Sequence, residues 1–201
     1  MLESGSLSLV VARSELIVGG QKSGKSRRAE MLAHSWLAGA AGRQAVLIAT
    51  ARRSDEEMVA RIERHRRDRA CRVPAMATIE EPLALATVIG RHTGPKVLLV
   101  VDCLTLWLTN RLWADHGDAA SAPVALADAA AASAVLLQAI GAAAGPIVLV
   151  SNEIGLGVVS MGREVRAFVD ALGQLNQQVA RACQRVTLMA AGLPLGLKDL
   201  A

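Results

Sequence analysis

Five short runs of mostly apolar residues divide the chain. They are rich in Val, Leu and Ile and comprise residues 16–18, 45–49, 97–101, 147–150 and 186–190. Runs of this length without polar alternation are typical of strands that are buried on both faces of a parallel sheet. The pattern therefore predicts five buried strands.

Helical patterns occupy the segments between these runs. From residue 29 to residue 37, apolar side chains recur at three- and four-residue spacing, and Gly39 ends the pattern. Ser54 and Glu57 have the spacing of a capping box, which predicts that a helix begins there. Further helices are predicted over residues 105–113, 123–140 and 163–181.

The alternation of strands and helices predicts an α/β fold in three layers, with a mainly parallel sheet and helices on both faces. Ligands of such folds bind beyond the carboxyl ends of the strands. Residues 14–201 are expected to form a single domain. Residues 1–13 precede the first predicted strand, and we expect them to be a disordered or loosely attached N-terminal extension.

The composition is that of one globular domain without cross-links. Hydrophobic residues make up 52% of the 201 residues and aromatic residues 2%, so the core is expected to consist of Ala, Leu and Val. The three cysteines have the spacing of neither a disulfide framework nor a zinc site, which favours a reducing cytoplasm. No stretch approaches the ~20 apolar residues that a membrane span needs, so none is expected.

The positive charge is concentrated in one segment. The net charge is +4, and residues 52–72 contain eight arginines and five acidic residues, so they carry +3 of it (8 − 5). Proteins that bind single-stranded nucleic acid combine such charge with aromatic side chains for base stacking, and these are nearly absent here. We therefore expect a local surface for small anions and no nucleic-acid partner.

Residues 19–26 read Gly-Gly-Gln-Lys-Ser-Gly-Lys-Ser and match the P-loop pattern G-x-x-x-x-G-K-[ST] between a predicted strand and a predicted helix. In such a loop, backbone N–H groups and the helix N-terminus bind phosphates. Lys25 is expected to bridge the outer phosphates and the Ser26 hydroxyl to hold Mg²⁺. The motif predicts an enzyme that uses the phosphates of ATP or GTP.

Polar residues follow two other predicted strands. Asp102 comes directly after residues 97–101, where a P-loop enzyme places the second group on its magnesium ion. The alternative role of Asp102 is the N-cap of the following helix, and both roles are compatible. Asn152 and Glu153 follow the fourth strand, where each is either a contact to substrate or metal or an ordinary loop residue.

A histidine lies in the basic segment. His65 is flanked by Arg64 and Arg66, and a helix would bring Arg61 and Arg69 close to it. Four cations would lower the pKa of His65 and keep its imidazole neutral near pH 7, as attack on a phosphorus atom requires. The other interpretation is an ordinary surface histidine on a basic helix, and the local sequence does not separate the two.

Taken together, these residues make the chain resemble the bifunctional adenosylcobinamide kinase and adenosylcobinamide-phosphate guanylyltransferase family of cobalamin biosynthesis. The resemblance runs from about Glu15 to Lys198. A P-loop alone occurs in many enzymes, whereas this ordered series of blocks is specific. The blocks comprise residues 19–30, 48–51, 55–58, 60–62, 65–66, 80–82, 101–105, 109–110, 151–159, 168–170 and 173–177.

The resemblance implies two reactions. In the first, the γ-phosphoryl group of ATP or GTP passes to the aminopropanol hydroxyl of adenosylcobinamide. In the second, a histidine attacks the α-phosphorus of GTP, pyrophosphate leaves, and the histidine-bound GMP passes to adenosylcobinamide phosphate to give adenosylcobinamide-GDP. The matching histidine is His65. Some relatives have two adjacent histidines there, and this chain has Arg64 in place of the first.

The resemblance also implies the site residues. The catalytic residues are His65 and Lys25, and Mg²⁺ is held by Ser26 and Asp102. The implied nucleotide contacts are Gly19, Gly20, Gln21, Lys22, Ser23, Gly24, Lys25, Ser26, Thr50, Ala51, Arg52, Glu80 and Asp102. For Glu80 the alternative role is that of a loop anchor.

Family members are similar to recombinase-like P-loop proteins and assemble as homotrimers, so the same fold and assembly are expected here. Two departures are visible, because Gln21 and Lys22 replace a commoner Ala-Arg, and Ser160 replaces a usual proline. Neither removes a reacting group. We also expect residues 52–72 to close over the nucleotide to bring His65 into reach.

Two other functions are compatible with the P-loop. A one-step small-molecule kinase would use His65 only for binding and would form no covalent adduct. A regulatory NTPase would hydrolyse its nucleotide slowly and would not depend on a corrinoid.

Overall fold

The computed structural model describes residues 9–113, 122–157 and 161–200, so Ser160 lies outside the described residues. The strands are β1 (Ser14–Gly19), β2 (Gln44–Ala49), β3 (Ala77–Glu80), β4 (Val97–Asp102), β5 (Ile147–Val150), β6 (Arg185–Ala190) and β7 (Leu193–Asp199). The helices are α1 (Lys25–Ala38), α2 (Glu56–Arg72), α3 (Leu85–His92), α4 (Leu104–Trp113), α5 (Ala122–Ala142) and α6 (Arg163–Ala182). None of these helices is long and apolar enough to cross a membrane.

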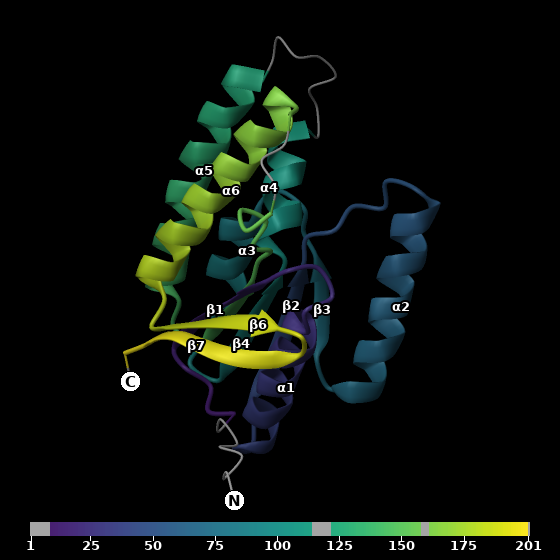
Figure 1. Cartoon of the computed structure of the whole chain (residues 1–201). Coiled ribbons are helices and arrows are strands. Elements are labelled where there is room, and N and C mark those ends of the chain that lie inside the picture. The colour runs from purple at the N-terminus through teal and green to yellow at the C-terminus, as the bar shows by residue number, and fades with distance from the viewer. Residues whose placement is uncertain (1–8, 114–121, 158–160, 201) are drawn as a thin grey trace, which may run out of the picture.

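The strands form one sheet in the order β3-β2-β4-β5-β1-β6-β7 (Figure 1). Every neighbouring pair is parallel except β6 and β7, which are antiparallel. The carboxyl ends of β1, β4 and β5 therefore lie at one edge of the sheet, and the segments that follow these strands come together there.

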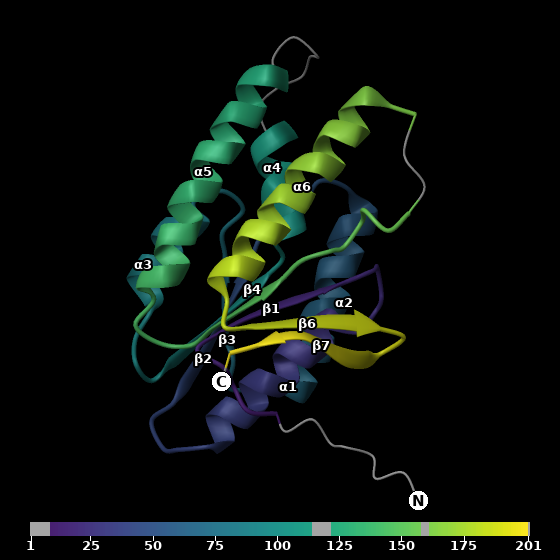
Figure 2. The same ribbon diagram turned by 60° about the vertical axis from the view of Figure 1, so that its left-hand side comes forward.

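Helices cover both faces of the sheet, as the alternating pattern predicts. Figure 2 shows α1 below the sheet and α3, α4, α5 and α6 above it. Successive residues of β1 serve the two cores, because strand side chains alternate between faces. Leu16 and Val18 pack with the α3 to α6 layer, and Ile17 packs with α1. The predicted three-layer α/β class is confirmed.

All five predicted strands are present, as β1, β2, β4, β5 and β6, and the structure adds β3, β7 and α3. β3 is short and mostly exposed at one edge of the sheet. β7, at the other edge, contains Pro194 and Gly196, which read as strand breakers. The N-cap of α2 is Asp55, whose carboxylate accepts from the Met58 N–H, and not the predicted Ser54.

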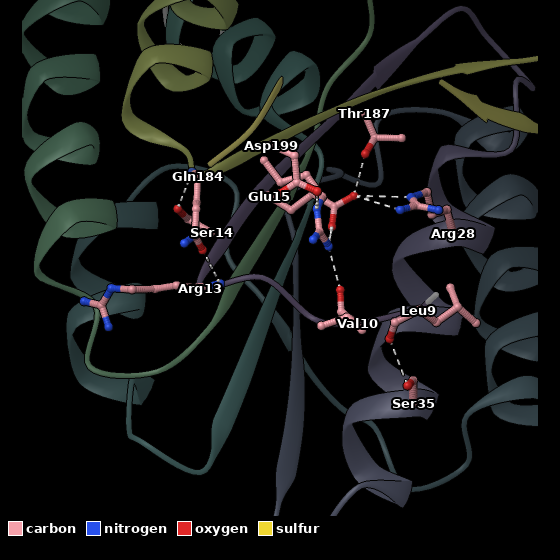
Figure 3. Close-up of polar contacts among 11 residues, drawn as sticks. Leu9, Val10, Arg13, Ser14, Glu15, Arg28, Ser35, Gln184, Thr187 and Asp199 are labelled. Atoms are coloured by element: carbon pink, nitrogen blue, oxygen red, sulfur yellow. Dashed lines mark hydrogen bonds and ion pairs between the residues drawn. The ribbon is translucent and has the colours of Figure 1, made fainter. Parts of the chain in front are cut away.

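The described part of the predicted extension is attached to the domain, which corrects that expectation for residues 9–13. The Leu9 carbonyl accepts a hydrogen bond from the Ser35 hydroxyl at 3.0 Å, and the Val10 carbonyl accepts one from Arg185 at 2.6 Å (Figure 3). Ala12 is buried. Residues 9–13 are therefore held by contacts to α1 and β6, which the composition of the segment does not reveal.

A buried ion-pair network ties β1 to α1 and β6. Glu15 is fully buried, and its Oε1 accepts from Arg28 Nε at 3.2 Å and from the Thr187 hydroxyl at 2.7 Å (Figure 3). Arg185 lies 3.7 Å from the other carboxylate oxygen and also pairs with Asp199 at 3.0 Å. Arg28 belongs to the first turn of α1, so the network holds the start of that helix against the sheet.

Glu15→Gln is expected to lower the free energy of unfolding by about 3 kcal/mol, because Arg28 and Arg185 would lose the carboxylate that balances their charge. The matched control is Asp199→Asn, which removes the exposed carboxylate beside Arg185 and is expected to cost under about 1 kcal/mol. Urea denaturation followed by circular dichroism measures both. An equal loss of unfolding free energy in the two variants would contradict the expectation that breaking the buried ion pair costs more than breaking the exposed one.

Candidate active site

The P-loop connects β1 to α1 and is held from both sides. Two of its three glycines have backbone angles that other residues rarely adopt, with φ of 151° at Gly19 and 100° at Gly24. A Cβ atom on Gly19 would lie 2.4 Å from the Met189 carbonyl oxygen. The Gly19 carbonyl accepts from the Glu153 N–H at 3.0 Å, and the Ser23 carbonyl accepts from the Gly192 N–H at 3.1 Å. The loop is therefore fixed by the segments that follow β5 and β6.

The interior of the loop suits a phosphate group. Lys25 is buried, and its Nζ donates to the Gly19 carbonyl at 3.0 Å and the Gly20 carbonyl at 2.6 Å. Burial lowers the pKa of Lys25, and the negative charge of Asp102 opposes this effect. The Ser23 hydroxyl is buried and has no hydrogen-bond partner within the described chain. An anion with several oxygens would supply partners to both side chains.

Ser26 and Asp102, the two residues predicted to hold Mg²⁺, line the same two clefts. Ser26 lies in the first turn of α1 and Asp102 at the end of β4, and both are half-buried. The described residues contain no cluster of three or more histidine, cysteine or acidic ligands. One hydroxyl and one carboxylate fit Mg²⁺, which takes few protein ligands when nucleotide phosphates complete its shell. Since α4 begins at Leu104, the N-cap position belongs to Cys103 and not to Asp102.

Two of the clefts near the P-loop have α2 as a wall. The larger cleft, of about 500 Å³, lies between the P-loop and α2. The smaller cleft, of about 110 Å³, lies between α2 and the ends of β2 and β3. Both are lined by Ser26, Arg61, His65, Asp102 and Cys103. The structure thus brings His65 to the same cleft as the P-loop. The closure of residues 52–72 over a bound nucleotide stays a prediction.

Polar contacts anchor α2 to the sheet and to α1. None of its residues is buried. Arg66 forms an ion pair with Glu80 at the end of β3, and Arg72 Nε lies 3.1 Å from a carboxylate oxygen of Glu30 on α1. Arg69 donates to the Thr78 hydroxyl at 3.3 Å. Three arginines of α2 therefore hold His65 over the cleft.

The pKa of His65 lies below its ordinary value of 6.5, as predicted, but the first cause is different. Partial burial against the cleft has the largest effect, and the positive charges of Arg61 and Arg64 lower the pKa further. The carboxylates of Asp102 and Asp68 act in the opposite direction. The imidazole is therefore mostly neutral at pH 7, which is the form that a nucleophile requires.

The other predicted nucleotide contacts occupy different places. Thr50 is fully buried, and its hydroxyl donates to the Cys103 carbonyl at 2.6 Å and accepts from the Cys103 N–H at 2.8 Å. It joins the ends of β2 and β4 and lines neither cleft. Ala51 and Glu80 line the smaller cleft. Arg52 is half-buried and is not among the residues that line these two clefts.

Sequence reasoning overlooked Glu30 as a cleft residue. Glu30 is buried, lies four residues after Ser26 on α1, and lines the larger cleft. That spacing places it on the same face of the helix as Ser26 and could have identified it.

Of the two residues that follow β5, Asn152 lines the larger cleft. The Glu153 carboxylate accepts from the Gly155 N–H at 3.1 Å and so shapes its own loop.

The sequence is similar to those of known proteins along most of its length. A bifunctional adenosylcobalamin biosynthesis protein of Pseudomonas aeruginosa is 46% identical over 184 residues, which cover 92% of this chain and 96% of the relative. The proteins of the same description from Escherichia coli and Salmonella typhimurium are 34% and 33% identical, and each match covers 91% of this chain and 98% of the relative.

The family model described as cobinamide kinase / cobinamide phosphate guanyltransferase matches residues 15–197, which include the P-loop, α2 with His65, and Asp102. The match spans nearly the whole described domain. The chain belongs to the cobinamide kinase / cobinamide phosphate guanyltransferase family.

Proposed function

We propose that this protein phosphorylates adenosylcobinamide with ATP or GTP and then transfers GMP from GTP to the product, giving adenosylcobinamide-GDP. The observation that carries the proposal is that the P-loop and His65 line one cleft. A kinase step needs the first feature, and a nucleotidyl transfer through a covalent intermediate needs both. The family's name contains the same two activities.

The kinase step depends on positioning and charge. Phosphoryl transfer requires an acceptor hydroxyl in line with the γ-phosphorus and cations that neutralise the equatorial oxygens. The backbone N–H groups of the P-loop, with Lys25, would hold the β- and γ-phosphates. Ser26 and Asp102 would hold Mg²⁺, which supplies further positive charge to those phosphates.

The second step uses His65 as a nucleophile. Its neutral imidazole attacks the α-phosphorus of GTP, the bond to the bridging oxygen breaks, and pyrophosphate leaves with the electron pair. The phosphate group of adenosylcobinamide phosphate then displaces the histidine from the GMP. Ala51 and Glu80, which line the smaller cleft beside His65, are the proposed contacts to the nucleoside.

The test is incubation with GTP labelled at the α-phosphate. The protein is expected to acquire a label that is labile to acid and stable to base, as a phosphoramidate is. Addition of adenosylcobinamide phosphate should move the label into adenosylcobinamide-GDP. GTP labelled at the γ-phosphate is the control and should leave no label. A protein that phosphorylates the corrinoid but takes up no α-label is a one-step kinase, and slow hydrolysis independent of a corrinoid indicates a regulatory NTPase.

The rate of label uptake is expected to depend on pH through His65. Because its pKa is lowered, the neutral form dominates at pH 7, and the rate should be constant there. It should fall about tenfold per pH unit once the pH drops below that lowered pKa. Arg64→Gln removes a cation that lowers the pKa, so the acidic limb should move to higher pH. A limb that stays in place in this variant, measured by rapid quench, would contradict the electrostatic assignment.

The proposal extends to assembly and location. We propose a homotrimer in the cytoplasm, with the exposed leucines of edge strand β7 as part of the subunit contact. Leu193, Leu195 and Leu197 have 71%, 58% and 57% of their surface exposed, which is unusual for an isolated edge strand. Analytical ultracentrifugation measures the mass. A monomer at micromolar concentration would contradict this part of the proposal.

A further inference from the structure

Arg61 lies at the point where the two clefts meet. It belongs to α2, one helical turn before His65, and lines both the larger and the smaller cleft. Residues four apart on a helix share one face. The guanidinium and the imidazole therefore face the cleft from the same side, opposite the P-loop.

Arg61 differs from the other arginines of α2 that reach the sheet or α1. Arg66 is paired with Glu80, Arg72 with Glu30 and Asp68, and Arg69 with the Thr78 hydroxyl. Arg61 has neither a hydrogen bond nor an ion pair with any residue in the described ranges. Its guanidinium can therefore make all of its contacts with a ligand.

The charge of Arg61 acts on both residues that are proposed to be catalytic. It lowers the pKa of His65 and that of Lys25, so it lies within electrostatic range of the nucleophile and of the P-loop cation. Like charges that face one another across a cleft repel unless an anion lies between them. The arrangement of Arg61 opposite Lys25 is thus complementary to a chain of phosphates.

We propose that Arg61 is a catalytic residue of the guanylyl transfer, binding the α- and β-phosphate oxygens of GTP and stabilising the negative charge of the departing pyrophosphate. This inference rests on the function proposed above. Arginine suits the role because its planar guanidinium contacts two phosphate oxygens at once. Lys25 is less suited to the α-phosphate, since its Nζ is held at the Gly19 and Gly20 carbonyls of the loop.

The electron balance of the step shows where Arg61 acts. The lone pair of the unprotonated His65 nitrogen forms a bond to the α-phosphorus. The bond from that phosphorus to the α,β-bridging oxygen breaks, and its electrons remain on pyrophosphate. The proton on the other ring nitrogen passes to water after the adduct forms. Negative charge grows on the bridging oxygen during this step, and a guanidinium beside it lowers the barrier.

The experiment compares Arg61→Ala with Arg67→Ala in the presence of α-labelled GTP. Arg67 is an exposed arginine of the same helix and is not among the residues that line either cleft, so the control removes the same charge and side chain. Label uptake by Arg61→Ala is expected to be about 100-fold slower or more, whereas Arg67→Ala should keep the wild-type rate. Arg61→Lys should recover only part of the loss, and added guanidinium should partly restore Arg61→Ala.

The rate of the kinase step in Arg61→Ala distinguishes a catalytic role in guanylyl transfer from a role in maintaining the structure of the site. In the γ-phosphoryl transfer the charge grows on the β,γ-bridging oxygen and not on the α,β-bridging oxygen, so the loss of kinase kcat in Arg61→Ala is expected to be much smaller than the loss of label uptake. Label uptake at the wild-type rate in Arg61→Ala, or an equal loss in Arg67→Ala, would overturn the proposal. So would a loss of both steps to the same extent.

Failure of the proposed function would be recognised separately. If the wild-type protein takes up no label, the histidine mechanism is wrong whatever Arg61 does, and with it the catalytic role of Arg61. The affinity for pyrophosphate, measured by calorimetry, then decides whether Arg61 contacts phosphate groups. Binding at least tenfold weaker in Arg61→Ala than in Arg67→Ala would keep the phosphate contact, and equal binding would overturn it.

Discussion

His65→Asn is expected to abolish label uptake from α-labelled GTP, by at least about 10⁴-fold, because asparagine has no nitrogen lone pair that can attack phosphorus. The same variant should still phosphorylate adenosylcobinamide, since the P-loop, Lys25, Ser26 and Asp102 are untouched. His65 lies on the exposed helix α2, which has no buried residue, so the substitution is expected to leave the fold stable.

The matched control for that variant is His34→Asn. His34 is an exposed histidine on α1 that is not among the residues lining the two clefts beside the P-loop. Its replacement should change neither step. Rapid quench with α-labelled GTP gives the first rate, and chromatography of the phosphorylated corrinoid gives the second. Normal labelling of His65→Asn would place the covalent bond on another residue and would remove the basis of the histidine mechanism.

Lys25→Ala is expected to lose both steps, each by at least about 10³-fold. The buried Nζ already lies against the Gly19 and Gly20 carbonyls at the mouth of the loop, where the outer phosphates would bind. Both steps need these phosphates held, as the transferred γ-phosphoryl group and its leaving diphosphate in the first and as the leaving pyrophosphate in the second. Removing the cation should weaken nucleotide binding and leave the charge of either transition state without its nearest partner.

The control for Lys25→Ala is Lys96→Ala, which removes an exposed lysine outside both clefts. Lys25→Met is a second test, because it keeps the apolar stem and separates loss of charge from loss of packing. Thermal unfolding of each variant measures whether the P-loop keeps its structure. If Lys25→Met retains either step at more than about a tenth of the wild-type rate, the shared phosphate cradle is contradicted.

The local parts of the site could be predicted from the sequence because their signals are local. Residues 19–26 carry the P-loop pattern between a strand and a helix, and the structure places them between β1 and α1. Asp102 follows an apolar run that becomes β4, an inner strand whose carboxyl end lies at the same edge as that of β1. The glycines of a tight loop and the apolar run of a buried strand each leave a pattern within a few consecutive residues. A short stretch of sequence is therefore enough to recognise them.

The parts that sequence reasoning missed depend on neighbours that are distant along the chain. Glu30 and Arg72 are 42 positions apart (72 − 30), yet they form one of the contacts that hold α2. Thr50 reads as a nucleotide contact after β2, but its hydroxyl is bonded to Cys103 after β4. β3 and β7 lie at the edges of the sheet, where one-sided burial leaves a weak hydrophobic pattern.

The sequence by itself determined the α/β class, the family and the P-loop, because apolar periodicity and an ordered series of motifs are properties of the chain alone. Only the tertiary structure decided that His65 lines the same cleft as Ser26 and Asp102, and that Arg61 lies unpaired within the described chain while Arg66, Arg69 and Arg72 are paired. The physical reason is that charge pairing and burial depend on distance in space. These distances were set when α2 was anchored to Glu30 of α1 and Glu80 of β3.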